Sequence, residues 1–276
     1  MDIYNLKDIE RIYVFGGLND RFTDITHRIM EEGFYNSLVI AIGNKNFTFY
    51  DFNTIKEKFA ESNSYFASNN INLFIIRGND LDPMIFENKL INFSNIKTIS
   101  DYSIIKTKNK NILCIGGSIS YNRDWKITYE ELTSKFNKEK SSLYFENECF
   151  NLDKNKINEL KEIKDNIDYI VTQTAPFSVD NISYLSKIKF FKYNKVLLKD
   201  VIKEKKKIDS LFKTLKKNNT IKKWLYSENE YDIVTSYERV DFIPVMMDTF
   251  LDISKENKMK EKELLSFNDL FHELIS

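Results

Sequence analysis

The chain has 276 residues, 41 Lys and Arg against 41 Asp and Glu, and a hydrophobic content of 42%. This length fits one large domain or two small ones, and the aromatic content of 14% excludes an intrinsically disordered chain. The zero net charge argues against a protein whose main task is to coat nucleic acid.

Three features of the sequence indicate where in the cell the protein is expected: its apolar runs, its first residues and its cysteines. Apolar runs such as residues 37–42 have only strand length, so we expect no membrane contact. The first eight residues lack the basic segment and apolar core of a secretory signal. Cys114 and Cys149 are too few for a disulfide framework. We therefore expect a cytoplasmic location, in the host cytoplasm or the virion if a phage encodes the protein.

The first half of the chain alternates short apolar strands with amphipathic helices. Continuous apolar strands between such helices are typical of α/β folds, in which both faces of a sheet are covered. In open α/β sheets the loops at the carboxyl ends of the strands form the site. The predicted strands are residues 11–15, 37–42 and 72–76, with helices at about 22–32 and 54–68 between them.

The second half predicts a hairpin, further strands and three helices. We expect one domain over residues 1–250, followed by a C-terminal amphipathic helical appendage over residues 251–276. The predicted strands are residues 102–105 and 111–115 (the hairpin), 169–171, 224–226, 231–234 and 240–243, and the predicted helices are 153–164, 199–219 and 259–275.

The helix at 199–219 is rich in lysine, which raises the question of a nucleic-acid partner. Glu204 and Asp209 interrupt the lysines, and the apolar residues face inward. A solvated helix face is therefore the better interpretation, and we expect no nucleic-acid partner. The lysines are Lys203, Lys205, Lys206, Lys207, Lys213, Lys216 and Lys217, and the inward residues are Val201, Ile208, Leu211, Phe212 and Leu215.

Five short motifs follow successive predicted strands. In order, spacing and strand context they resemble the motifs of the calcineurin-like metallophosphoesterases, over about residues 10 to 245. Arg77 and the turn from Gly116 to Arg123 also match that family. The resemblance implies a four-layer α/β/β/α sandwich whose motif loops meet at one edge. The motifs are Gly16-Gly17-Leu18-Asn19-Asp20, Gly43-Asn44, Gly78-Asn79-Asp80-Leu81-Asp82-Pro83, Val171-Thr172-Gln173-Thr174-Ala175-Pro176 and Trp224-Leu225-Tyr226-Ser227-Glu228-Asn229-Glu230.

The ligand positions depart from the family pattern. The resemblance implies two close metal ions held by Asp, His and Asn side chains. Asn79 keeps the family's residue, and Asp80 replaces the histidine that acts on the phosphate. The two histidines of the chain, His27 and His272, lie in predicted helices and read as surface or core residues. The remaining Asp and His ligands fall on Gly17, Asn19, Asn44, Gln173, Glu228 and Glu230.

These departures predict that the chain holds no metal and no other cofactor, and has no catalytic residue. The eight residues that fall on the family's site form a vestigial cleft. We expect its amides to donate hydrogen bonds to its carboxylates. The vestigial cleft consists of Gly17, Asn19, Asn44, Asn79, Asp80, Gln173, Glu228 and Glu230.

Other chemistries have weaker support in the sequence. Neither cysteine has a histidine partner in a recognisable motif, and Cys114 reads as a core residue. The paired glycines are wrongly spaced for a phosphate-binding loop. Asp80, Glu228 and Glu230 could do general acid and base work, although no substrate is indicated.

Three functions remain open. The first is a catalytically inactive pseudoenzyme that binds a protein partner or itself through aromatic residues and the C-terminal helix. The abundant Asn and Ile indicate an AT-rich genome such as a phage's, so a virion component is one form of this hypothesis. The alternative keeps one hard cation, Mg²⁺ or Ca²⁺, on oxygen ligands, with weak or altered hydrolase activity. The third is an active phosphoesterase with a rearranged site.

Overall fold

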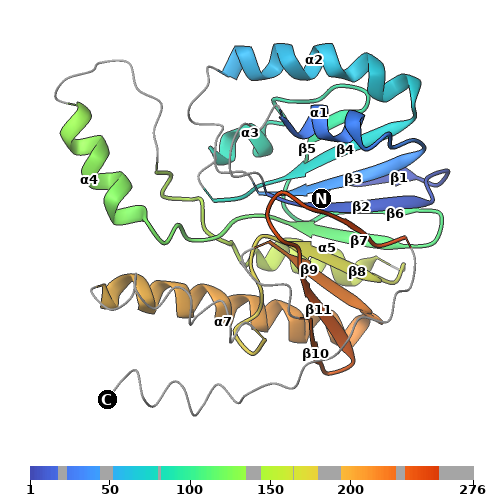
Figure 1. Cartoon of the computed structure of the whole chain (residues 1–276). Helices are drawn as coiled ribbons and strands as arrows, with labels where there is room; N and C mark the ends of the chain where they lie inside the picture. Colours follow the sequence, from blue (N-terminus) through green and yellow to red (C-terminus); the bar gives the residue numbers. More distant parts are fainter. Residues whose placement is uncertain are drawn as a thin grey trace.

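The computed structural model describes residues 1–17, 24–43, 52–79, 82–134, 144–163, 165–179, 194–227 and 234–254. Within them the chain forms two mostly parallel sheets (Figure 1). The first sheet has five strands, and β12 runs antiparallel to its neighbour while the other pairs are parallel. In spatial order the strands are β12 (Phe250–Asp252), β2 (Arg11–Gly16), β3 (Ser37–Ile42), β4 (Ile71–Ile76) and β5 (Ile96–Thr98).

The second sheet has seven strands. Its hairpin, β6 with β7, is antiparallel, as is β10 with β11 at one edge, and the other pairs are parallel. In spatial order the strands are β1 (Ile3–Leu6), β6 (Ser103–Thr107), β7 (Asn111–Ile115), β8 (Tyr169–Thr172), β9 (Lys223–Tyr226), β11 (Val240–Pro244) and β10 (Thr235–Tyr237).

The two sheets share a hydrophobic cluster. Val14 and Ile40 from the five-stranded sheet pack in one cluster with Cys114, Val171 and Leu225 from the seven-stranded sheet. Every residue of β3, β4, β8 and β9 is buried. Strands of this kind need cover on both faces, which explains their continuous apolar sequences.

Helices supply the cover on the other face of each sheet. Ile25, Ile55 and Ile85 join the second cluster, which lies against the five-stranded sheet. Ile157 and Phe212 join the third cluster, which lies against the seven-stranded sheet. The helices involved are α1 (Asp24–Glu31), α2 (Phe52–Ser68) and α3 (Pro83–Glu87) on the first sheet, with α5 (Lys154–Glu162) and α7 (Lys195–Asn218) on the second (Figure 1).

Helix α4 (Arg123–Ser134) differs from these helices. It contributes no residue to the hydrophobic clusters and projects from the body of the protein in Figure 1. It was not predicted from the sequence, although Trp125, Tyr129 and Leu132 follow one another at helical spacing. The short elements β1, β5, α3 and β12 were also not predicted, since three to five residues carry too little periodicity.

The mixed α/β class predicted from the sequence is confirmed, and the predicted hairpin is present as β6 and β7. Two other predictions fall wholly or mostly outside the described residues: the helix at 259–275 and the strand at 231–234. The edge strand β10 begins at Thr235, directly after the second of these segments. The predicted domain boundary after residue 250 falls inside β12. Across the part of the chain that the structure describes, no helix is both long and apolar enough to cross a bilayer.

Candidate functional site

The loops that follow five strands meet at one place, which we call the loop junction: Gly17, Gly43, Gly78, Gln173 and Ser227. The backbone N–H of Gly17 donates to Ser227 Oγ at 3.1 Å. The N–H of Ser227 donates to the carbonyl of Gln173 at 3.3 Å. A Cβ on Gly43 would stand 3.0 Å from the Cα of Gly78. These contacts place the ends of β2, β3, β4, β8 and β9 side by side.

Gly17 has no room for a side chain. A Cβ built on it would stand 2.3 Å from the carbonyl oxygen of Gly43 and 2.9 Å from that of Ile42. Both atoms belong to the backbone, so neither can move aside as a flexible side chain would. Glycine at this position is therefore required by packing against the chain that leaves β3.

Gln173 fills the space beside Gly43. Its side chain is only 8% exposed, and its Nε2 donates to the carbonyl of Ser227 at 3.4 Å. A Cβ on Gly43 would stand 1.8 Å from Gln173 Oε1, and the φ of +52° at Gly43 also favours glycine. Among the described residues, Gln173 Oε1 is a buried acceptor without a hydrogen-bond partner. The carboxylates to which Gln173 was expected to donate lie outside the described residues, so that donation stays a prediction.

The structure describes three of the eight residues predicted for the vestigial cleft. Gly17 and Gln173 lie in the loop junction, and the half-buried Asn79 follows Gly78 directly. The other five lie outside the described residues: Asn19, Asn44, Asp80, Glu228 and Glu230.

Two of the three described ligand positions differ from the donors that the resemblance implies for a pair of metal ions. Gly17 offers no coordinating atom and no space for one. Gln173 offers a neutral amide where a metal pair needs an imidazole or a carboxylate. Among the residues with a described placement, no group of three or more His, Cys, Asp or Glu side chains is arranged to hold a metal ion. His27 is an exposed residue of α1 beside Glu31, as its position in a predicted helix suggested.

Arg77 holds the neighbouring segments together. Its buried guanidinium donates to Asp101 Oδ2 at 2.7 Å and to the carbonyl of Glu148 at 2.7 Å, with further bonds to two adjacent carbonyls. Asp101 in turn accepts from the N–H of Gly116 at 2.8 Å. Arg77 therefore ties the end of β4 to the turn after β7 and to the segment at 144–150.

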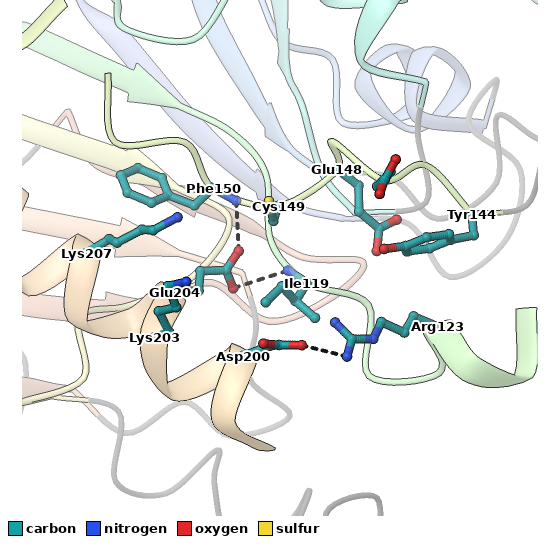
Figure 2. A pocket seen from close by; sticks show the side chains of 11 residues that line it. Ile119, Arg123, Tyr144, Glu148, Cys149, Phe150, Asp200, Lys203, Glu204 and Lys207 are labelled. Atoms are coloured by element: carbon teal, nitrogen blue, oxygen red, sulfur yellow. Dashed lines mark hydrogen bonds and ion pairs between the residues drawn. The ribbon is translucent and has the colours of Figure 1, made fainter. Parts of the chain in front are cut away.

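A pocket of about 190 Å³ lies beside this network, between α7, the segment at 144–150 and the turn that precedes α4 (Figure 2). Glu204 occupies its centre and accepts hydrogen bonds from the N–H groups of Phe150 (2.7 Å) and Ile119 (3.2 Å). Arg123 pairs with Asp200 at 2.7 Å across one side. The lining residues are Ile119, Arg123, Tyr144, Glu146, Glu148, Cys149, Phe150, Asp200, Lys203, Glu204 and Lys207.

Burial raises the pKa of several groups that line this pocket. Removal from water raises the pKa of Glu204 to about 7, although two N–H donors favour the carboxylate. Burial also raises the pKa of Glu148, against the attraction of Lys126, whose Nζ lies 3.8 Å away. Burial raises the pKa of the Cys149 thiol as well, and that of the core residue Cys114. Neither cysteine is therefore an activated nucleophile.

Sequence reasoning missed the buried acids of this pocket. A signal existed for Glu204, because Val201, Glu204, Ile208, Leu211 and Leu215 follow the helical spacing of one buried stripe. No such signal marked Glu148, which lies in an irregular segment. The inward direction of the predicted apolar residues of α7 is confirmed, since all of them are buried.

Comparison with known proteins gives no further assignment: no protein-family model matches this chain, and no curated protein matches it.

Proposed function

We propose that this chain is a metallophosphoesterase-like pseudoenzyme, which keeps the scaffold of that family without its metal centre and acts by binding. The observation that carries the proposal is the lack of space for a side chain at Gly17. The resemblance places a metal-binding aspartate at this position. Here the backbone of residues 42 and 43 occupies the space that its Cβ would need, so the loop is built for glycine.

The arrangement of the sheets supports the proposed scaffold. One hydrophobic cluster joins the sheets, and one further cluster on each sheet contains helix residues. This order agrees with the four-layer α/β/β/α sandwich that the resemblance implies. The meeting of the five motif loops at the carboxyl ends of their strands also agrees with it.

The exposed face of α4 supports a protein partner. Trp125 is 60% exposed, and its ring stacks on that of Tyr129 with centroids 5.2 Å apart. Leu132 continues the same side of the helix and is also exposed. Large exposed aromatic residues on one helix face are typical anchors of protein interfaces.

One observation favours the alternative function, a single hard cation. Gln173 Oε1, at the loop junction, is a buried oxygen that has no hydrogen-bond partner within the described part of the chain. A Mg²⁺ or Ca²⁺ ion coordinates amide oxygens of this kind. Asn79, the next chain position after Gly78, carries a second one.

Metal content and turnover separate these functions. For the proposed pseudoenzyme we expect less than one equivalent of transition metal after purification with Mn²⁺, and a melting temperature that EDTA leaves unchanged. We also expect no metal-dependent hydrolysis of generic phosphomonoesters or phosphodiesters. The single substitution Asn44→Asp should not restore hydrolysis, because Gly17 still offers no ligand.

Three results would count against the pseudoenzyme. Two tightly bound equivalents of metal would show a working centre. A melting temperature that falls with EDTA, together with one bound Mg²⁺ or Ca²⁺, would favour the alternative. Metal-dependent hydrolysis that Asp80→Ala abolishes would establish an active enzyme.

A further inference from the structure

The three acidic residues of α7 all have partners on the side of the protein body. Glu204 is buried and accepts from two backbone N–H groups. Asp209 accepts from the N–H and the hydroxyl of Ser178, at 3.2 and 2.8 Å. Asp200 pairs with Arg123. Contrary to the interpretation from sequence, the buried Glu204 does not interrupt the lysines on the outer side of this helix.

The outer side of α7 is therefore cationic along its whole length. We call its six exposed lysines the lysine face. None of the six forms an ion pair with a described residue, whereas Lys216 of the same helix does, as do Lys89, Lys106 and Lys108 elsewhere. From first to last they span about 33 Å of helix at the usual rise of about 1.5 Å per residue. The lysine face consists of Lys195, Lys199, Lys203, Lys206, Lys213 and Lys217.

This arrangement opposes the stability of the helix. Lys195, Lys199 and Lys203 follow one another at i, i+4 spacing, where like charges repel. Lys195 and Lys199 also lie in the first turns, where the helix dipole favours acids over cations. An anion bound along the face would reduce both the repulsion between the lysines and the unfavourable interaction with the helix dipole. A solvated face with mixed charges would have neither cost.

The lysine face is hollowed at its middle. Lys199, Lys203 and Lys206, with Lys207, line a groove of about 460 Å³ together with three uncharged or apolar residues. A concave surface with four ammonium groups and no carboxylate among its lining residues suits phosphate oxygens. The three other lining residues are Leu152, Ile202 and Ser210.

From these observations we propose that the lysine face binds the phosphate backbone of duplex nucleic acid without regard to sequence. Duplex DNA carries about one negative charge per 1.7 Å of its axis, so phosphates lie within reach of each lysine along the row of about 33 Å. A single strand is less suited, because such binding relies on exposed aromatic platforms, and Phe177, whose ring lies beside Lys206, is half-buried. A membrane is less suited, because the apolar stripe of α7 is buried and not available for insertion.

The test measures fluorescence anisotropy of a labelled mixed-sequence duplex of roughly 30 base pairs, with the full chain, across a salt series. Six phosphate contacts predict an affinity that falls about 10³-fold between about 50 and 200 mM salt. Lys199→Glu, Lys203→Glu and Lys213→Glu together should weaken binding at the lower salt by at least about 30-fold. They should also roughly halve the slope of log affinity against log salt.

The matched control carries the same charge change on exposed lysines elsewhere, Lys7→Glu, Lys56→Glu and Lys154→Glu. The same three α7 lysines changed to Arg should keep the affinity of the original protein. The proposal is overturned if the α7 variant and the control variant bind equally. It is also overturned if a single strand, or vesicles with anionic lipid, bind more tightly than the duplex. The inference does not depend on loss of catalysis, so a working metal centre would leave its outcome unchanged.

Discussion

Gly17→Asp is expected to destabilise the fold by at least about 3 kcal/mol and to restore no metal binding. The substitution reinstates the aspartate that the resemblance implies. Its Cβ, however, would stand 2.3 Å from the carbonyl oxygen of Gly43, far inside van der Waals contact. Relief requires the chain after β3 to shift, and Gln173 already fills the space beside Gly43.

Gly17→Ala adds only a Cβ and therefore measures the steric part of the destabilisation. Gly33→Ala is its matched control. A Cβ on Gly33 meets no atom within 4 Å, so that substitution costs only the strain of its φ of +63°, about 1 kcal/mol. Urea unfolding measures all three variants. A Gly17→Ala variant as stable as Gly33→Ala would show that the loop junction can open, and the steric argument for the pseudoenzyme would then fail.

The sequence identified Gly17 as a lost ligand and did not reveal why glycine is needed there. The reason is a contact with Gly43, which lies after a different strand. Periodicity predicts which residues of β2 and β3 are buried, because strand burial is a local pattern. It does not predict how closely two loops approach, which depends on the register of the strands, and that register emerges only from the packed sheets.

In helix α7, too, the sequence predicts the buried residues but not the tertiary contacts. Its apolar stripe and its helical state follow from spacing, and the structure agrees. The direction of each acidic side chain does not follow from composition: read along the sequence, Glu204 and Asp209 interrupt the lysines. In the fold, Glu204 is turned to backbone N–H groups of two distant segments, at Ile119 and Phe150. The charge of a helix face is therefore set by tertiary partners.

Helix α4 shows that apolar spacing alone does not identify which face of a helix is buried. Its apolar residues Trp125, Tyr129 and Leu132 would normally indicate a buried stripe, yet all three are exposed. The residue of α4 that is buried is Lys126, which donates to Ser120 Oγ at 2.9 Å and faces Glu148. A pattern that assigns apolar residues to the core cannot distinguish a buried stripe from an exposed one.

The free energy of unfolding should fall as pH rises from about 5 to about 8, and Glu204→Gln should remove most of that fall. Burial raises the pKa of Glu204 from 4.5 to about 7. Between these values the folded protein holds a proton that the unfolded chain releases. The stabilisation is thus complete below about pH 4.5 and is lost as pH rises through about 7, a change on the order of 3 kcal/mol.

Glu204→Gln keeps an acceptor for the N–H of Phe150 and cannot ionise, so its stability should vary little across this range. The variant should therefore gain on the original protein as pH rises, and the two curves should diverge most at about pH 8. Glu57→Gln, which removes an exposed carboxylate on α2, is the matched control and should follow the original protein. The raised pKa of Glu148 adds a fall of the same sign in both proteins, because its carboxylate is also buried. Urea unfolding at several pH values tests the difference between them. If Glu204→Gln and the original protein lose stability in parallel, the prediction is wrong. The ionised carboxylate of Glu204 would then be as stable between α7 and the segment at 144–150 as it is in water.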